Sequence, residues 1–372
     1  MSDRAIRLLL VNTVPTVRNG QTMFLLKYLR AMDLSDMAVG YVARNEVPAE
    51  LRAQLTALGV RIYELPMRNR KPLAYLKRLT AIIRAEKYNI VHANGNSATL
   101  FWEMLAARRC GVPVRIAHSH NTFCVHRAVH RMLYWPMQWL TNYPMACGTA
   151  AGRWLFGRRR FEVVPIASDP ETYRYRPETR AAMRGRMGLE GRIAVGCVAG
   201  FAPQKNHAFL LRAFAEAHRR NEALHLVLIG DGKLRDEIEA QIRALALSDC
   251  VTLTGEVPDV PDRLQAMDAM ALPSLFEGFP NVLVEWQLAG LPALVSDAVT
   301  RECDLTGLLR YLPLDEEAWA EALAGLSTVD REAASRDGAE QVARRGYDVR
   351  VEAARLKGRY RQMLEEQRAS HS

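Results

Sequence analysis

The chain has 372 residues, of which 49% are hydrophobic and 24% charged, and this is enough apolar material for two domains with separate cores. No apolar run approaches the roughly 20 residues that a membrane-spanning helix needs, and the charged N-terminus is unlike a signal peptide. Six scattered cysteines without a Cys-x-x-Cys pair argue against a zinc knuckle, a redox dithiol or a disulfide framework. We therefore expect buried free thiols and a cytoplasmic protein.

The net charge of +9 is unevenly placed along the chain. Residues 1–170 contain 24 Lys and Arg against 10 Asp and Glu, whereas residues 171–372 contain 26 against 31. Several basic clusters in the first half lie near aromatic residues, among them Tyr75, Trp102 and Trp154. This favours a peripheral contact with an anionic membrane on its inner face, or a phosphorylated acceptor; solvated helix faces are the alternative. Nucleic acid is not an expected partner, because no recognisable binding module organises the charge.

In the first half of the chain, short apolar runs alternate with segments of helical spacing. The predicted strands are 6–12, 37–41, 90–93 and 114–117, and the predicted helices are 23–29, 49–58, 73–86 and 99–109. Such alternation favours a mostly parallel sheet.

The same pattern restarts after Pro165. The predicted strands are 193–198, 224–229, 251–253 and 269–272, and the predicted helices are 207–219, 234–246 and about 280–289. A long charged amphipathic helix is predicted over 349–366, with no strand after it. The fold class is therefore α/β with two Rossmann-like domains, and ligands are expected at the carboxyl ends of the strands.

Two carboxylates, Glu277 and Glu285, are separated by seven residues that hold a Gly-Phe-Pro turn and the start of a helix. Pro280 suits the first turn of that helix, and Gly290 suits its end. The amide groups at 279–282 would form an anion-binding terminus between the two acids, which predicts a ligand site. An ordinary surface loop and helix with two solvated acids is the alternative.

This acidic motif resembles that of the retaining GT-B glycosyltransferases of family 4. The segment 198–207 is similar to the family's Gly-Arg-Phe-x-x-Gln-Lys-Asn sequence: Lys205 matches the Lys, but Gly200 replaces the Arg. Residues 230–232 and 253–260 match the family's glycine turn and its base-facing segment, and 147–157 resembles the EpsF-like exopolysaccharide branch. The resemblance covers nearly the whole chain and is most specific from Ala199 to Pro292.

The resemblance implies transfer of a sugar from a nucleotide donor, a UDP-sugar, with retention and without a metal or other cofactor. It places Glu277 at the donor sugar, Glu285 at the ribose, Lys205 at the leaving diphosphate and His120 at the sugar. The further donor-binding residues that it implies are Asn19, Gly20, Gly200, Gly278, Phe279, Pro280 and Asn281, with Glu256 and Val257 near the base. His118 shares a strand face with His120, yet no third metal ligand has suitable spacing.

The GT-B resemblance also implies two domains facing a cleft. Residues 1–168 would be the acceptor domain, 169–348 the donor domain, and 349–372 a helix crossing back onto the first domain. The implied acceptor is a lipid-linked or polysaccharide glycan in capsule, exopolysaccharide or lipopolysaccharide synthesis.

Two alternatives stay open. The first is a non-catalytic GT-B subunit that binds a partner or a glycan, since Gly200 removes a phosphate-binding guanidinium and Ile166-Ala167 replaces the family's Asn-Gly turn. The second is a nucleotide-sugar epimerase, which needs no glycan acceptor. If the chain is a transferase, another base such as Arg18 is a candidate to supply the missing charge.

Overall fold

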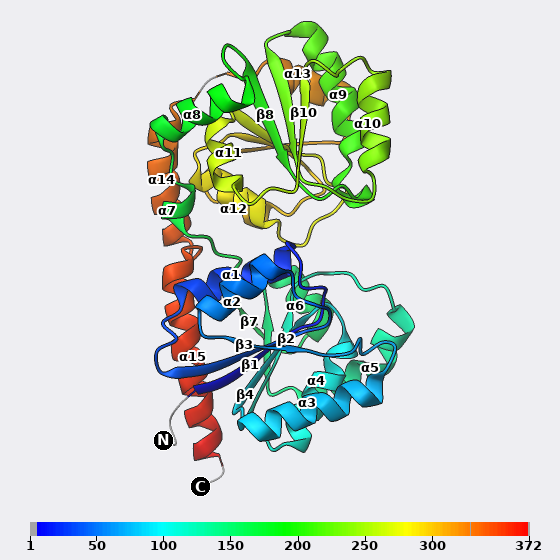
Figure 1. The fold of residues 1–372 in the computed structure, drawn as a ribbon, viewed down its shortest axis with the longest axis vertical. Coiled ribbons are helices and arrows are strands. Elements are labelled where there is room, and N and C mark those ends of the chain that lie inside the picture. The colour runs from blue at the N-terminus through cyan, green and yellow to red at the C-terminus, as the bar shows by residue number, and fades with distance from the viewer. Residues whose placement is uncertain (1–5, 328, 371–372) are drawn as a thin grey trace. The chain divides into compact units, whose positions relative to one another are not determined.

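The computed structural model describes residues 6–327 and 329–370 and divides into two compact units. Unit 1 comprises residues 1–167 and 348–372, and unit 2 comprises residues 168–347. Each unit is a parallel sheet covered by helices on both faces (Figure 1). The predicted α/β class with two Rossmann-like sheets is confirmed.

The sheet of unit 1 has seven strands in the order β3-β2-β1-β4-β5-β6-β7. The strands are β1 (Ile6–Asn12), β2 (Met37–Ala43), β3 (Arg61–Glu64), β4 (Ile90–Gly95), β5 (Val114–Ser119), β6 (Tyr143–Ala146) and β7 (Glu162–Val163). The helices are α1 (Gly20–Ala31), α2 (Ala49–Ala57), α3 (Pro72–Glu86), η1 (Ala98–Leu100), α4 (Phe101–Arg109), α5 (Arg127–Leu140), α6 (Thr149–Phe156) and α15 (Val349–Ala369). The strand order reverses between β1 and β4, so the loops that leave these strands diverge at the carboxyl edge.

The C-terminal helix α15 packs on unit 1, as the GT-B resemblance implies. The buried Lys357 ammonium pairs with two carboxylates, Asp33 at 2.8 Å and Asp36 at 2.6 Å. Further along the helix, the hydroxyl of Tyr360 lies 2.8 Å from Nδ1 of His92 in β4. These contacts join the end of the chain to the first domain through both its charged and its buried residues.

The sheet of unit 2 has six strands in the order β10-β9-β8-β11-β12-β13. The strands are β8 (Ile193–Val198), β9 (Leu224–Ile229), β10 (Val251–Gly255), β11 (Ala269–Leu272), β12 (Ala293–Ser296) and β13 (Leu309–Leu312). The helices are α7 (Pro170–Tyr173), α8 (Pro177–Met187), η2 (Pro203–Lys205), α9 (His207–Arg220), α10 (Arg235–Ala244), α11 (Val260–Ala266), α12 (Asn281–Leu288), η3 (Arg301–Cys303), α13 (Glu316–Ala324) and α14 (Arg331–Arg344). Here the order reverses between β8 and β11.

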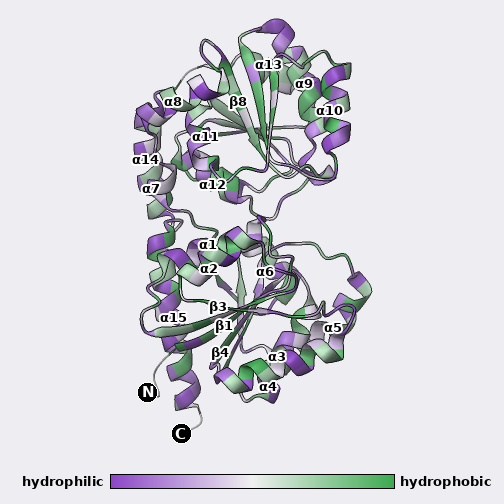
Figure 2. Ribbon diagram, in the orientation of Figure 1, coloured by the Kyte–Doolittle hydropathy of each residue, from purple (hydrophilic) through white to green (hydrophobic). Residues whose placement is uncertain are grey.

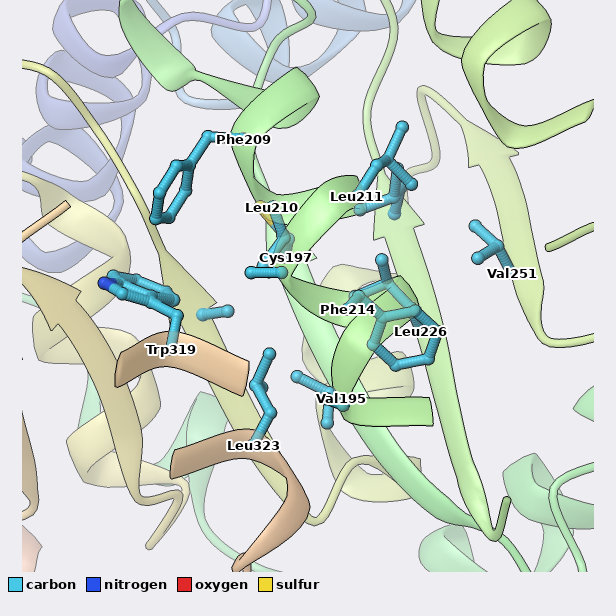
Figure 3. Packing of buried hydrophobic residues seen from close by; sticks show 14 of the residues in the cluster. Val195, Cys197, Phe209, Leu210, Leu211, Phe214, Leu226, Val251, Trp319 and Leu323 are labelled. Carbon is cyan, nitrogen blue, oxygen red and sulfur yellow. The ribbon is translucent and has the colours of Figure 1, made fainter. Parts of the chain in front are cut away.

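Apolar strands of unit 2 are buried on both faces, as parallel sheets require. On one face α9, α10 and α13 cover the sheet, and the ring of Trp319 meets that of Phe209 edge to face at 5.6 Å between centroids (Figures 1 and 3). Figure 2 shows the same segregation across each unit, with apolar strands inside and polar residues on the outer helix faces. This packing fixes the strand ends from which the loops of the candidate site emerge.

Several elements were not among those predicted from the sequence. These include the strands β3, β6, β7, β12 and β13, each of four residues or fewer. Helix α5 contains Pro136, which interrupts a helical pattern. Of the cysteines, all free as predicted, five are buried and Cys110 is half-buried.

Candidate functional site

Lys205 and Glu277 meet where the strand order of unit 2 reverses. Lys205 follows β8 at the end of the turn η2, and Glu277 lies in the loop that follows β11. The ammonium Nζ is 2.5 Å from Oε1 of the carboxylate. The loops after these neighbouring strands diverge at the carboxyl edge, the place where open α/β sheets bind ligands. Lys205 and Glu277, which the family resemblance implies at the diphosphate and the donor sugar, are therefore in contact within unit 2.

The carboxylate of Glu277 is held by more than the lysine. Ser274 Oγ donates to Oε1 at 2.8 Å, and Gln204 Nε2 donates to Oε2 at 3.1 Å. The backbone joins the same loops, because the amide of Leu275 donates to the carbonyl of Gln204 at 2.8 Å. Only 9% of the Glu277 side chain is exposed, against 24% for Lys205. Charge-assisted bonds at both oxygens leave this carboxylate little freedom to rotate.

The glycine turn after β9 packs against the loop that contains Gly200. A Cβ at Gly230, whose φ is +147°, would lie 2.1 Å from the carbonyl oxygen of Ala199, and one at Gly232 would lie 2.5 Å from that of Phe201. Glycine is therefore required at both positions. By contrast, Gly200 is exposed and its Cβ would meet only the Asp231 carbonyl, at 3.6 Å, which is an ordinary contact.

Helix α12 begins at Asn281 and ends at Leu288, within the predicted range of about 280–289. Pro280 is the N-cap residue and provides no side-chain cap, so the first amides depend on other acceptors. Glu285 is in the second turn and is 9% exposed. Before the helix, Phe279 is buried and stacks on Tyr347 with 5.4 Å between ring centroids. This stacking fixes the loop that presents the half-buried Gly278 and the helix terminus.

The segment predicted to face the nucleotide base follows β10. Glu256 is exposed and Val257 is half-buried. The preceding Gly255 forms an isolated bridge with Gly230, whose amide donates to the Gly255 carbonyl at 3.0 Å. The base-facing segment and the glycine turn are thus attached to each other at the carboxyl edge of the unit 2 sheet.

In unit 1, three stacked histidines lie on β4 and at the carboxyl end of β5. His92 Nε2 lies 2.9 Å from His118 Nδ1, and the rings of His118 and His120 stack with 4.2 Å between centroids. The same face for His118 and His120 is the arrangement predicted from strand alternation. Burial lowers the pKa of His92 to about 3. Burial, followed by the neighbouring histidines, lowers the pKa of His118 well below its usual value.

His120 occupies the end of β5 and is less covered than the other two rings. Its Nε2 lies 2.8 Å from Oδ1 of Asn94, so a proton on Nε2 is donated to that amide and Nδ1 remains an acceptor. Phe24 meets the His120 ring edge to face at 4.9 Å. Burial against these neighbours lowers the pKa of His120. The arrangement presents a neutral imidazole with a defined tautomer.

Asn19 lies at the end of the loop after β1, and Gly20 is the first residue of α1. Asn19 is the N-cap of α1: its side-chain oxygen accepts from the Thr22 amide at 3.0 Å, and its Nδ2 donates to the Pro15 carbonyl at 2.7 Å. Gly20 is exposed at the first helical position. The Asn19 side chain thus caps helix α1, whereas the sequence analysis considered it only as a donor-binding residue.

Two interpretations of basic residues change with the structure. Arg18, a candidate source of the missing phosphate charge, forms an ion pair with Glu50. Arg68 pairs with the fully buried Glu103 at 2.7 Å, and the buried Tyr75 donates its hydroxyl to the same carboxylate, also at 2.7 Å. Arg68 and Tyr75 are therefore part of an internal network and do not form an exposed basic and aromatic surface.

Gln204, Ser274, Asn94, His92 and Tyr360 were not selected from the sequence. Gln204 and Ser274 belong to the segments that contain Lys205 and Glu277. Their polar side chains within these motifs were a signal from which the sequence could have predicted them as site residues. The contacts of His92 with Tyr360 join residues 268 positions apart, for which the sequence offers no signal. Within residues 6–327 and 329–370, no group of three His, Cys, Asp or Glu is placed to hold a metal ion. No helix in those ranges is long and apolar enough to cross a membrane.

Comparison with protein-family profiles matches both units of the chain. Residues 19–152 match the glycosyl transferase 4-like domain, and residues 192–328 match glycosyl transferases group 1. The second match contains Lys205 and Glu277.

Similar curated proteins and solved structures agree with these profiles. The chain is 33% identical over 336 residues to the putative glycosyltransferase EpsF of Bacillus subtilis, covering 84% of this chain and 86% of EpsF. It is 27% identical over 253 residues to the UDP-Gal:α-D-GlcNAc-diphosphoundecaprenol α-1,3-galactosyltransferase of Escherichia coli, covering 63% of this chain and 64% of that enzyme. Anabaena Alr3699/HepE in complex with UDP and glucose superimposes with a TM-score of 0.77 at 19% identity, covering 98% of this chain and all of that one.

Proposed function

The chain belongs to the group 1, glycosyltransferase 4-like family of GT-B glycosyltransferases, and we propose that it transfers a sugar from a nucleotide donor with retention at the anomeric carbon. The family resemblance drawn from the motifs is thereby confirmed. The observation that carries the proposal is the Lys205–Glu277 pair at the strand reversal of unit 2. Nucleotide ligands bind at that edge in doubly wound sheets.

In the proposed reaction the donor is a UDP-sugar. This is supported by the UDP named with the HepE structure and by the UDP-galactose named for the Escherichia coli relative. Residues 168–347 would hold the donor, with Glu285 at the ribose and Glu256 and Val257 near the base. The two carboxylates, Glu277 and Glu285, suit hydroxyl groups, because an ionised carboxylate accepts hydrogen bonds at both oxygens.

Lys205 would stabilise the charge that develops on the diphosphate as it leaves. The N-terminal end of α12, reached through Gly278 and Pro280, would add its amides and dipole to the same task. Together they would perform electrostatically what a divalent cation does in metal-dependent transferases, so we propose a metal-independent reaction. Glu277 would hold the donor sugar. Its Oε1 pairs with Lys205, and its Oε2, which accepts one hydrogen bond from Gln204, can accept another from a sugar hydroxyl.

His120 would act on the sugar from unit 1. Its neutral ring and its bond to Asn94 leave Nδ1 as an acceptor, which suits a sugar hydroxyl. Asn19 and Gly20 would contribute backbone groups, because the Asn19 side chain caps α1.

We propose that the acceptor is a lipid-linked or polysaccharide glycan in capsule, exopolysaccharide or lipopolysaccharide synthesis. The diphosphoundecaprenol in the name of the Escherichia coli relative and the similarity to EpsF support this class. Residues 1–167 would receive this acceptor at the inner face of the membrane, where their excess of basic residues suits anionic lipid.

A non-catalytic subunit is the second candidate, and Gly200 is the observation that favours it. The family's Arg at this position would give the diphosphate a bidentate partner that Lys205 cannot replace. Arg18 is paired with Glu50 and is not a free substitute. An epimerase is a further alternative, and release of a free sugar without any acceptor would identify it.

The experiment is a panel of UDP-, GDP- and other nucleotide sugars, assayed for binding, for hydrolysis and for transfer to membrane lipid extracts. Wild type is compared with the Lys205→Ala and Gly200→Arg variants. Turnover of one donor, lost in Lys205→Ala, is the expected result. Nucleotide binding without turnover in every variant would favour the non-catalytic subunit, and so would the absence of any nucleotide binding; either result would contradict the proposed transfer.

A further inference from the structure

Helix α5 of unit 1 exposes one apolar stripe. Met132, Trp135 and Trp139, at positions i, i+3 and i+7, are 68%, 63% and 77% exposed. On the opposite side Met137 and Gln138 are buried, and the Gln138 amide donates to the Leu155 carbonyl at 2.8 Å. The exposed stripe is therefore the outer face of a helix that is firmly attached to its unit.

The apolar surface continues into the segment before the helix. Phe123 and Val125 are exposed there, and so is Val129 in the first turn of α5. Isolated exposed apolar residues are normal on protein surfaces, but six large ones within residues 123–139, two of them tryptophans, mark a contact surface. We call residues 123–139 that are exposed and apolar the α5 stripe.

The charge around the α5 stripe has one sign. From residue 104 to residue 161 the chain contains nine Arg and no Asp, Glu or Lys. Arg127 and Arg131 flank the stripe and are exposed. Among the residues that the structure describes, neither has a carboxylate partner. An anionic contact surface is the complement of such a segment.

An arginine-lined cavity of about 720 Å³ lies in the same unit. Arg153, Arg158, Arg159 and Arg160 line it together with Thr149 and Phe161. Arg159 is bound to the end of α5, donating to the carbonyls of Gln138 at 2.6 Å and Thr141 at 2.7 Å. In the described part of the chain, the other three arginines have no ion-pair partner. The cavity is thus attached to α5 and adds free guanidinium groups beside its C-terminal end.

We propose that the α5 stripe and this cavity form the surface by which the protein docks on an anionic lipid bilayer. Trp135 and Trp139 would lie among the headgroups, where amphipathic indole rings are favoured. The free guanidinium groups of Arg153, Arg158 and Arg160 would contact lipid phosphates, for which a planar fork is well suited. This inference assigns a surface to the proposed membrane association. It rests on the proposed function only for the role of that association, which is access to a lipid-linked acceptor.

A bilayer fits this surface better than a second copy of the chain. In a two-fold dimer the same patch contacts itself, so two unpaired sets of arginines would be brought together. An anionic bilayer supplies both an apolar interior for the stripe and phosphates for the arginines. Of the basic and aromatic clusters singled out in the sequence, the one near Trp154 supplies the arginines of this cavity, whereas Arg68 and Tyr75 are internal.

The test is sedimentation of the full chain with vesicles of phosphatidylcholine alone or of phosphatidylcholine mixed with phosphatidylglycerol. One variant carries Trp135→Ala and Trp139→Ala, and another carries Arg158→Ala and Arg160→Ala. A matched control carries Arg336→Ala and Arg344→Ala, which remove the same charge from exposed positions of unit 2. Leu73→Ala, at an exposed apolar residue of α3, is the control for lost apolar surface. Donor hydrolysis in vesicle-free buffer is measured for every variant.

Wild type and both controls are expected to bind the anionic vesicles, with binding weakened by salt. Each test variant should bind the anionic vesicles at least about tenfold more weakly than wild type. The tryptophan fluorescence should shift to the blue on binding, and hydrolysis in buffer should stay unchanged. Equal sedimentation of test and control variants would overturn the inference. It would also be overturned if wild type did not bind vesicles and instead formed a concentration-dependent dimer that the tryptophan substitutions abolish. Vesicle binding with neither donor hydrolysis nor transfer to membrane lipid extracts would keep this inference and reject the proposed function.

Discussion

The ammonium of Lys205 and the carboxylate of Glu277, 72 positions apart in the chain, lie 2.5 Å from each other. One belongs to the loop after β8 and the other to the loop after β11, so the ion pair bridges the strand reversal of the unit 2 sheet. A bound diphosphate would compete with the carboxylate for the ammonium. Because the two side chains bind each other when no donor is bound, both are already oriented before the donor arrives. Electrostatic catalysis needs such preorganisation.

We expect Glu277→Gln to abolish most turnover while the fold remains intact. The amide has the size of the carboxylate but lacks its charge, so the ion pair with Lys205 and the orientation of the donor sugar are lost. The rate should fall by about a hundredfold or more. Steady-state kinetics checks the rate, and circular dichroism checks the fold. Glu237→Gln, at an exposed residue of α10, is the control, and similar rates in the two variants would reject the assignment.

Ser274→Ala should lower kcat with little change in KM for the donor. Ser274 is fully buried and acts through Glu277, to which its hydroxyl donates at 2.8 Å, so it is a positioning residue. A misplaced carboxylate costs rate, and we expect a decrease of about tenfold. Ser274→Thr keeps the hydroxyl and should restore part of the rate. A loss of thermal stability with unchanged kcat would show a purely structural role.

Gly200→Arg should strengthen donor binding. The new Cβ has room, since its nearest neighbour is the Asp231 carbonyl at 3.6 Å, and the guanidinium would return the family's phosphate ligand. A charge-assisted bond contributes about 1.5–3 kcal/mol, so the dissociation constant for the nucleotide should fall by about tenfold or more. Calorimetric titration measures it, and unchanged affinity would mean that the loop does not contact the phosphates.

Gly232→Ala provides the structural contrast in the same region. Its Cβ would lie 2.5 Å from the Phe201 carbonyl oxygen, so the backbone must move. We expect the free energy of unfolding to decrease by about 1–3 kcal/mol. Denaturant titration checks this, and an unaltered midpoint would show that the turn adapts without cost.

Acid should destabilise unit 1 through its buried histidines. The pKa of His92 is lowered to about 3, and that of His118 is also lowered, so the unfolded chain binds protons that the folded unit excludes. Their stabilising contribution is complete above the unfolded pKa of about 6.5 and is lost as pH falls below it, at about 1.4 kcal/mol per pH unit for each histidine.

Denaturant titrations between about pH 7 and pH 5 measure this slope. His92→Gln removes one titrating group, so its free energy of unfolding should fall less steeply over that range than that of wild type. Identical slopes in wild type and His92→Gln would contradict the assignment of His92 as a neutral buried ring.

The main elements could be predicted because their signals are local. The strand before Lys205 is a short apolar run, and the helix after Glu277 has its proline and glycine ends within ten residues. The motif around Glu277 also holds Ser274, so one of its hydrogen-bond partners was within reach of sequence analysis.

The remaining features depend on contacts between distant segments. No residue adjacent to Arg18 in the sequence indicates that Arg18 pairs with Glu50. Likewise, no residue adjacent to Tyr360 indicates that its hydroxyl contacts His92. Helix α5 has apolar residues on both its buried and exposed sides, so the pattern alone cannot tell that Trp139 faces outward. Tertiary packing decides these points, and it becomes visible only in the folded chain.

The most direct measurement is a calorimetric titration of wild type and Lys205→Ala with UDP and with GDP, with Lys77→Ala as a charge-matched control in unit 1. We expect wild type and the control to bind one nucleotide with the same affinity, and Lys205→Ala to bind it at least about tenfold more weakly. Equal affinity in all three proteins, or no nucleotide binding by wild type, would contradict the placement of the donor diphosphate beside Lys205 and Glu277.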